Sequence, residues 1–351
     1  MDMGDLTPRI KLTTETLNLI AELDEFKGRW NATHSLAPER LATLKQVATI
    51  ESVGSSTRIE GAKLTNSEVE SLLRGIKTYS FRSRDEQEVG GYAELMELIF
   101  SSFGTIPLSE NHIKQLHGIL LSHSTKDERH RGGYKKFPNH VEAFDSNGKS
   151  LGIIFETVSP FDTPKKMSEL VEWTNTEFEK KELHPLLIIS IFVVWFLQIH
   201  PFQDGNGRLS RALTTLLLLH KGYSYVPYSS KERVIEENKE AYYLALRRGQ
   251  ATLGKGDAGL GEWMSFFLRC LLKQKTALEK KLDDEALLNK LPELSIQIIE
   301  LIKSRGPSSV ADIVAVSGAN RNTVKLHLKT LVAHGHLIQE GIARGTRYRL
   351  P

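Results

Sequence analysis

The sequence predicts a mainly helical protein with one β-hairpin and a small C-terminal domain. Apolar residues recur at helical spacing in most segments of the chain. Asn147 and Gly148 stand between two strand-like runs, which is the usual signal of a two-residue hairpin turn. The last segment, residues 291–351, contains three short helical patterns followed by two strand-like runs around a glycine-containing turn.

Length and composition exclude several classes of protein. The chain has 351 residues, of which 40% are hydrophobic and 25% charged, as in soluble proteins of two or three domains. Its formal net charge of +3 argues against a chain that coats nucleic acid throughout. The single cysteine, Cys270, permits no internal disulfide and fits a reducing compartment. The N-terminus lacks the apolar core of a secretory signal, so we expect a cytoplasmic protein with no membrane partner.

Helical patterns define a first region, residues 1–100. Apolar residues recur at helical spacing between Pro38 and Leu73, and the stretch GSSTRIEGAKLT interrupts them, so we expect two helices joined by a break there. A further amphipathic helix is expected over residues 85–100.

A second helical region is expected over residues 101–275, with a hairpin inside it. Ser109 precedes acidic and apolar residues and is expected to cap a helix. The apolar run Pro185–Ile199 is too short to span a bilayer comfortably and predicts a buried core helix. A lysine-rich linker helix, residues 276–290, is expected to lead to the domain at 291–351.

The stretch HPFQDGNGRLSR, residues 200–211, gathers groups that suit a phosphate. Gly205 and Gly207 allow positive φ angles and a close approach of the backbone to a ligand. If a helix starts within this stretch, its free N–H groups and positive dipole end favour an anion. Arg208 and Arg211 are three residues apart, so both project from one helix face and could clamp phosphate oxygens.

Two further residues of the stretch carry chemistry. Asp204 could hold magnesium, which prefers oxygen ligands and few protein carboxylates. His200 is a titratable base beside the same loop. Each of these residues alone is more often structural or solvated, and the segment matches neither a P-loop nor a calcium loop. Taken together they favour transfer from a nucleotide.

The whole stretch resembles the signature of the Fic (filamentation induced by cAMP) family, HxFx(D/E)GNGRxxR. The match covers every defined position, namely His200, Phe202, Asp204, Gly205, Asn206, Gly207, Arg208 and Arg211. The resemblance extends over about residues 40–270. It implies a mainly helical Fic fold with a β-hairpin flap, and transfer of AMP from ATP to a hydroxyl of a target protein.

The resemblance also implies roles for single residues. His200 would deprotonate the target hydroxyl, Asp204 would bind magnesium, and Phe202 would anchor the loop in the core. The hydroxyl would then attack the α-phosphorus in line, and pyrophosphate would leave.

The remaining residues of the signature would bind the triphosphate. The resemblance implies that the backbone amides from Gly205 to Gly207, together with Asn206, cradle the phosphates. Arg208 would hold the β- and γ-side of ATP, and Arg211 would bind the γ-phosphate.

Two other segments gain a role from the same resemblance. The hairpin, within residues 137–155, would be a flap that aligns the target's side chain by a strand-like contact, with an ordinary surface hairpin as the alternative. Tyr243 and Leu246 would line a nucleoside pocket, with Gln250 as a polar contact where relatives often carry asparagine. The alternative is an amphipathic helix that buries Tyr242 and Leu246 in the core.

The segment SSTRIEG, residues 55–61, resembles the inhibitory (S/T)xxxE(G/N) motif of many Fic proteins through Ser56, Glu60 and Gly61. In such relatives the glutamate pairs with the second arginine of the signature, here Arg211. The resemblance implies a self-inhibited chain, because a carboxylate there competes with the γ-phosphate for the arginine. A solvent-facing Glu60 is one alternative, and a glutamate that aligns water for the removal of AMP is another.

The C-terminal segment, residues 291–351, resembles a winged helix-turn-helix domain with Gly318 at the turn. Eight Lys and Arg residues against four Asp and Glu make it modestly basic, which is compatible with binding DNA. Base or phosphate contacts would fall at the start of the recognition helix, at Asn320, Arg321, Asn322 and Lys325. The alternative is a protein-docking or dimerisation domain. The sequence is compatible with a homodimer.

Residues and resemblance together predict an autoinhibited protein adenylyltransferase that uses ATP and magnesium. A DNA-binding regulator whose Fic fold senses a nucleotide is the alternative from another class, and transfer of another phosphate-containing group is a third. The intact His200 argues against a pure sensor, because a sensor needs no base.

Overall fold

The computed structural model describes residues 12–32, 38–75, 81, 83–144, 150–253, 258–289, 291–341 and 345–351. It divides the chain into two compact units, Met1–Ala277 and Leu278–Pro351.

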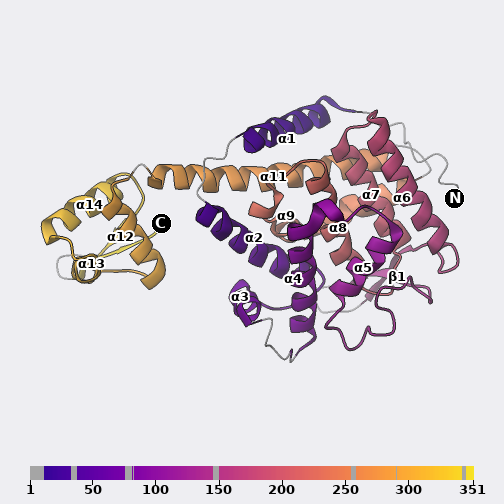
Figure 1. Ribbon diagram of the computed structural model, residues 1–351, viewed down its shortest axis with the longest axis horizontal. Coiled ribbons are helices and arrows are strands. Elements are labelled where there is room, and N and C mark those ends of the chain that lie inside the picture. Colours follow the sequence, from indigo (N-terminus) through magenta and orange to yellow (C-terminus); the bar gives the residue numbers. More distant parts are fainter. Residues whose placement is uncertain are drawn as a thin grey trace. The chain divides into compact units, whose positions relative to one another are not determined.

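The first unit is mainly helical, as the sequence predicts (Figure 1). Its helices are α1 (Thr14–Ala32), α2 (Pro38–Ile59), α3 (Asn66–Gly75), α4 (Arg84–Ser102), α5 (Glu110–Leu120), α6 (Thr163–Lys180), α7 (Pro185–Ile199), α8 (Asn206–His220), α9 (Lys231–Glu237) and α10 (Lys239–Thr252). Two short 3₁₀ helices are η2 (Phe103–Thr105) and η3 (Val226–Tyr228). A long helix, α11 (Ala258–Asn289), begins in this unit and ends in the second.

The core of the first unit is built around α7, as expected. Every residue from Leu186 to Leu197 is buried, because this helix is apolar on all sides. Helix α8 packs against α7 and also against α2, α4 and α5 (Figure 1). The loop between α7 and α8 therefore starts and ends on buried helices, which fixes the position of its backbone.

Local sequence explains where several of these helices begin. Ser109 caps α5 as expected, because its side chain accepts a hydrogen bond from the His112 N–H. Ser83 and Glu86 form a reciprocal capping box at the start of α4. Pro185 stands in the first turn of α7, where its missing N–H costs nothing.

The predicted break within GSSTRIEGAKLT lies later than expected. Helix α2 continues through GSSTRI, and the chain leaves it at Glu60. Gly54 does not end the helix; a Cβ there would stand 2.7 Å from Arg58 Nη1, so the glycine makes room for the arginine side chain. The helix ends instead before Gly61, whose φ of 108° favours glycine.

The expected hairpin is present as β1 (His140–Phe144) and β2 (Ser150–Glu156), paired antiparallel. His140 lies opposite Glu156, so the two ends of the hairpin meet at its stem. The Asn147–Gly148 turn lies outside the described residues.

The second unit contains three helices and a two-stranded sheet. They are α12 (Glu293–Arg305), α13 (Val310–Ser317), α14 (Arg321–Ala333), β3 (Ile338–Glu340) and β4 (Arg347–Arg349), and the strands pair antiparallel. Gly318 ends α13 with a φ of 65°, and Asn320 caps α14. The unit has an apolar core of its own, which includes Ile298, Ile302, Ile313, Val324, Leu328 and Leu331. This order of elements is the predicted one, and the winged helix-turn-helix assignment stays a prediction.

Within the described ranges, none of the helices combines the length and apolarity that crossing a bilayer requires.

The close packing of α4 on α5 leads to a testable prediction about Gly91. A Cβ at this position would stand 2.1 Å from the Leu120 carbonyl oxygen, so the Gly91→Ala variant must separate the two helices. We expect a loss of about 1–3 kcal/mol in the free energy of unfolding, measured by urea denaturation. Gly28→Ala in α1 is the matched control, because nothing lies within 4 Å of its Cβ. Equal stability of the two variants would contradict the close contact.

Candidate active site

His200 ends α7 in the left-handed conformation, with φ 52° and ψ 60°. Its N–H donates to the Phe196 carbonyl, and its ring Nδ1 lies 3.3 Å from the Leu197 carbonyl oxygen. A carbonyl can only accept, so Nδ1 carries the hydrogen and Nε2 of the neutral ring keeps its lone pair. Burial lowers the pKa of His200 to about 4, so the ring is neutral at pH 7 and can accept a proton through Nε2.

The loop after His200 turns into α8 at Gly205. This residue has φ 80°, and a Cβ there would also stand 3.0 Å from Leu120 Cδ2, so both backbone and packing favour glycine. The amides in the first turn of α8 have no acceptor within the helix. They form the positive end of the helix dipole, which is suited to an anion.

The Asn206 side chain is used within the loop itself. Its Oδ1 accepts from the Phe202 N–H at 2.9 Å, and its Nδ2 donates to the Phe202 carbonyl at 2.7 Å. The side chain is buried. Asn206 therefore closes the loop, which leaves its backbone amide as the group that can face a phosphate.

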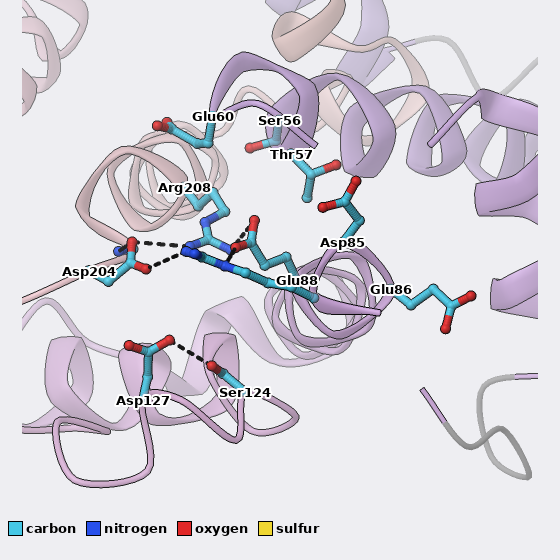
Figure 2. Close-up of polar contacts among 12 residues, drawn as sticks. Ser56, Thr57, Glu60, Asp85, Glu86, Glu88, Ser124, Asp127, Asp204 and Arg208 are labelled. Carbon is cyan, nitrogen blue, oxygen red and sulfur yellow. Dashed lines mark hydrogen bonds and ion pairs between the residues drawn. The ribbon is translucent and has the colours of Figure 1, made fainter. Parts of the chain in front are cut away.

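Arg208 and Asp204 belong to a cluster of four charges. Figure 2 shows Arg208 between Asp204 and Glu88. Its Nη2 lies 3.3 Å from Asp204 Oδ1, and its Nη1 lies 3.0 Å from Glu88 Oε2. Arg84 bridges the same two carboxylates, at 2.8 Å from Glu88 Oε1 and 3.1 Å from Asp204 Oδ2. The two arginines and two carboxylates therefore neutralise one another.

Arg208 has hydrogen-bonding capacity left over. It is 2% exposed, and its Nε and Nη1 have no hydrogen-bond partner among the described residues. The contact of Nη1 with Glu88 is an ion pair without the geometry of a hydrogen bond. Unsatisfied buried donors are rare, so these two point to an anionic ligand at this place.

Asp204 is ionised in this cluster. Burial raises the pKa of its carboxyl, but Arg208, the Gly205 N–H and Arg84 together bring the pKa below its usual value. Within the part of the chain that the structure describes, no group of three His, Cys, Asp or Glu side chains could hold a metal. A magnesium ion at Asp204 would therefore take its other ligands from phosphate oxygens and water, as this ion commonly does.

Arg211 is held by the last turn of α2. Its Nε donates to Ser56 Oγ at 2.9 Å, and its Nη2 donates to the Ser56 carbonyl at 2.9 Å and to Glu60 Oε1 at 2.8 Å. The Ser56 carbonyl is free to accept because the Glu60 N–H bonds to Thr57 instead, which tightens the end of the helix. The arginine is only 3% exposed, so these bonds satisfy a buried charge.

The Glu60 carboxylate lies over the start of α8. A Cβ at Gly207 would stand 2.2 Å from Glu60 Oε1, which measures how closely the carboxylate approaches the backbone there. The motif of Ser56, Glu60 and Gly61 is thus brought to Arg211, as the resemblance implies. An anion of the protein itself occupies the positive end of α8.

The residues expected to line a nucleoside pocket lie on α10. The pKa of Tyr243 is raised by burial and then by the charge of Glu60. Leu246 and Gln250 are buried on the same helix, as is Tyr242, whose ring centre lies 5.9 Å from that of Trp263 with the ring planes tilted by 59°. The Gln250 amide has no hydrogen-bond partner among the described residues, which leaves both the pocket and the core interpretation in place.

His117 is a residue of the site that the sequence analysis missed. Its ring is fully buried on α5, stacks on Phe202 at 3.8 Å and lies 3.0 Å from the Asp204 carbonyl oxygen. The Gly132 N–H donates to Nδ1, so Nε2 carries the hydrogen and donates to Asp204. The only signal in the sequence was a histidine within the apolar pattern of α5, which is more often a core residue.

The fold and the site together define the class of this protein as a helical protein with a glycine-rich loop at the start of a buried core helix. A family model of the Fic/DOC family matches residues 107–218. A solved Fic family protein from Desulfovibrio desulfuricans G20 is 25% identical, with a TM-score of 0.61, and the match covers 98% of both chains. The chain therefore contains a Fic/DOC family domain.

Curated relatives match a shorter part of the chain. The protein adenylyltransferase Fic of Drosophila willistoni is 28% identical over 216 residues, which are 61% of this chain and 40% of that protein. The same-named protein of Drosophila grimshawi is 28% identical over 229 residues, or 65% of this chain and 44% of the relative. The chain thus spans less than half the length of either relative. A segment of Fic-1 from C. elegans shares the fold at 18% identity, with a TM-score of 0.59 over 78% of this chain.

Burial of His117 predicts sensitivity to acid. Burial lowers the pKa of this residue from 6.5 to about 4. Between pH 6.5 and pH 4 this histidine binds a proton in the unfolded chain but not in the folded protein. The free energy of unfolding therefore falls as the pH falls through this range, by up to about 3 kcal/mol. The His117→Gln variant should be less stable at pH 7, with a difference from wild type that shrinks through this window. Urea denaturation at several pH values measures it, and a constant difference would contradict the assignment.

Proposed function

We propose that this chain transfers AMP from ATP to a hydroxyl side chain of a protein, and that Glu60 restrains this activity. The observation that carries the proposal is the set of groups at the N-terminus of α8. A neutral His200, a glycine-rich turn that leads into the first-turn amides of α8, and two buried arginines all border this helix end. The curated relatives named protein adenylyltransferase Fic support the same activity.

The chemistry follows from what each residue can do. His200 Nε2 takes the proton of the target hydroxyl as that oxygen attacks the α-phosphorus. The bond from the α-phosphorus to the bridging oxygen breaks, and pyrophosphate leaves. The amides of the first turn of α8 and the two arginines stabilise the charge on the phosphates, so positioning and electrostatics supply most of the rate.

Magnesium is the ion that we propose for Asp204. When bound, it would neutralise charge on the phosphates and on the leaving pyrophosphate. The residues present fit this ion, because Asp204 is an ionised carboxylate beside the phosphate loop. Arg84, which is about half exposed, would then exchange Asp204 for another partner.

The resting state would not bind ATP productively. Glu60 takes the Nη2 donor of Arg211 and lies against Gly207, at the place where a γ-phosphate would bind. Two negative groups cannot share this position, so ATP must displace the glutamate or bind in another pose. The hairpin at residues 137–155 is the proposed docking place for the target, and Tyr243, Leu246 and Gln250 are the proposed nucleoside contacts.

Removal of AMP and transfer of another phosphate-containing group are the alternatives for the same site. A Glu60 that stays near Arg211 could align a water for the removal of AMP. Incubation of an AMP-modified substrate with the wild-type chain distinguishes the two directions, because only removal releases free AMP without ATP.

Loss of the Glu60 carboxylate is expected to raise AMP transfer. A hydrogen bond to a charged group is worth about 1.5–3 kcal/mol, so freeing Arg211 in the Glu60→Gly variant should increase transfer by roughly tenfold or more. Intact mass and α-labelled ATP with magnesium measure the adduct. Glu60→Gln is the matched control, since it keeps the size of the side chain and removes its charge.

The same experiment tests the base. The double variant with Glu60→Gly and His200→Ala should form no adduct, because the proton acceptor is gone. If neither wild type nor Glu60→Gly acquires AMP, alone or with cell lysate, the proposed activity is wrong.

We propose, as a second function, that residues 291–351 bind duplex DNA through α14. This helix buries Val324 and Leu328 and exposes polar and basic residues along its outer face, namely Arg321, Asn322, Lys325 and Lys329. Such a face can contact phosphates and base edges in a groove.

DNA binding is expected to weaken steeply as salt rises. The Lys325→Ala variant should lower affinity and reduce the slope of log K against log salt by about one unit, which corresponds to one lost phosphate contact. Lys303→Ala on α12 makes the same change of charge at an exposed position on a different helix. Fluorescence anisotropy with a labelled duplex measures both, and no binding at low salt would rule the function out.

A further inference from the structure

A buried polar cluster joins the hairpin to the loop that carries His200. It consists of Lys135, Asn139 and Thr157, and we call it the stem clamp. Asn139 directly precedes β1, and Thr157 directly follows β2, so the clamp lies at the stem of the hairpin. None of the three residues belongs to the Fic signature.

The Lys135 ammonium is the centre of the clamp. Its Nζ donates to Asn139 Oδ1 at 2.9 Å, to Thr157 Oγ1 at 2.8 Å and to the Ile199 carbonyl at 3.0 Å. All three donors of the ammonium are therefore satisfied, by one residue on each side of the hairpin and by the residue before His200. Lys135 is 4% exposed.

Two further bonds run from the hairpin stem to the loop. The Lys135 N–H donates to the Pro201 carbonyl at 2.8 Å, and Asn139 Nδ2 donates to the Phe202 carbonyl at 2.8 Å. Carbonyl groups on both sides of His200 are thus held from the stem. Thr157 completes the clamp by donating to Asn139, so the two ends of the hairpin are bonded to each other as well as to the loop.

The buried charge of Lys135 is energetically unfavourable. A buried ammonium is unfavourable without an acidic partner, and the three hydrogen bonds of the Lys135 ammonium all go to neutral oxygens. Burial lowers the pKa of Lys135 to about 8, so the group still carries its charge at neutral pH. Attachment of a hairpin alone needs no charge, because apolar contacts would suffice. The fixed geometry of three donors around one nitrogen is what a lysine adds here.

We propose that the stem clamp fixes the distance between the hairpin and His200, so that a target segment docked on the hairpin presents its hydroxyl to Nε2. This inference rests on the proposed function and deepens it by naming Lys135 as a positioning residue. Since Lys135 Nζ bonds both ends of the hairpin and the Ile199 carbonyl next to His200, we expect a shift of the hairpin to shift the base as well. Misplacement of reacting groups by 1 Å is enough to lower a rate about a hundredfold.

The test uses the full chain in the Glu60→Gly background, where transfer is measurable. Lys135→Met removes the donors and keeps the length of the side chain, and Lys135→Arg keeps a charged donor. Lys136→Met is the matched control, because Lys136 is the adjacent exposed lysine. The readouts are self-modification by intact mass at varied ATP, and hydrogen exchange of the segments at 135–139 and 199–206.

We expect Lys135→Met to lower the maximal rate of self-modification by about tenfold or more, with the KM for ATP changed by less than about twofold. Lys135→Arg should restore part of the rate, and Lys136→Met should match its parent. Hydrogen exchange should increase in both segments together. If Lys135→Met does not fold, Thr157→Val, which replaces one hydroxyl by a methyl of similar shape, should show the same pattern with a smaller loss.

The outcomes separate the two proposals. A Glu60→Gly parent that forms no adduct overturns the proposed function. A parent that forms the adduct, with Lys135→Met and Thr157→Val at the same maximal rate, overturns only the positioning role. Faster exchange and lower thermal stability without a change in the maximal rate overturn the positioning role as well, since the clamp would then only support the fold.

Discussion

Burial of two guanidinium groups inside one helical core is the constraint on which the site depends. Arg208 and Arg211 stand one turn apart on α8 and are nearly inaccessible to solvent. A buried charge costs several kcal/mol unless it is paired, so each arginine needs partners from another element. Helix α4 supplies Glu88 for Arg208, and the end of α2 supplies Ser56 and Glu60 for Arg211. The N-terminal helices are therefore part of the site.

This constraint explains how the resting protein can be stable without a nucleotide. The positive end of α8 and the Arg211 guanidinium both attract an anion. The Glu60 carboxylate is this anion, because it lies against Gly207 and accepts a hydrogen bond from Arg211. Asp204 and Glu88 pair with Arg208 but satisfy its hydrogen-bond donors only in part. Two of these donors, Nε and Nη1, have no hydrogen-bond partner among the described residues. The loop at residues 200–205 is thus held by contacts within the chain itself, and the two arginines differ in how completely the protein satisfies their donors.

The parts of the fold that could be predicted from the sequence depend on local signals. The apolar run of α7, the cap at Ser109 and the hairpin each rest on residues within one short segment. The continuation of α2 through GSST was not predictable in this way. Gly54 and the serines after it have low helix propensity, and the contact of Arg58 with Glu236 on α9 helps to hold the helix there instead. Tertiary packing decided where that helix ends.

The same distinction holds within the site. The signature residues and Glu60 could be singled out because they follow known spacings. Glu88, His117 and Lys135 could not, since each acts on a residue far along the chain and has no pattern of its own. Their partners become visible only when helices α4 and α5 and the hairpin stem are brought to the loop at residues 200–205. A histidine or lysine in an apolar stretch carries no such information by itself.

Gly207 has a consequence for how such a chain can evolve. Its bare backbone is the surface against which the carboxylate of Glu60 lies, and it is also the surface that a phosphate would need. Under the proposed function, a larger residue at this position would exclude the Glu60 carboxylate and the nucleotide alike, so no substitution of Gly207 could separate restraint from activity. A descendant of this protein would then lose the restraint through α2, by losing the carboxylate or the last helical turn that carries it.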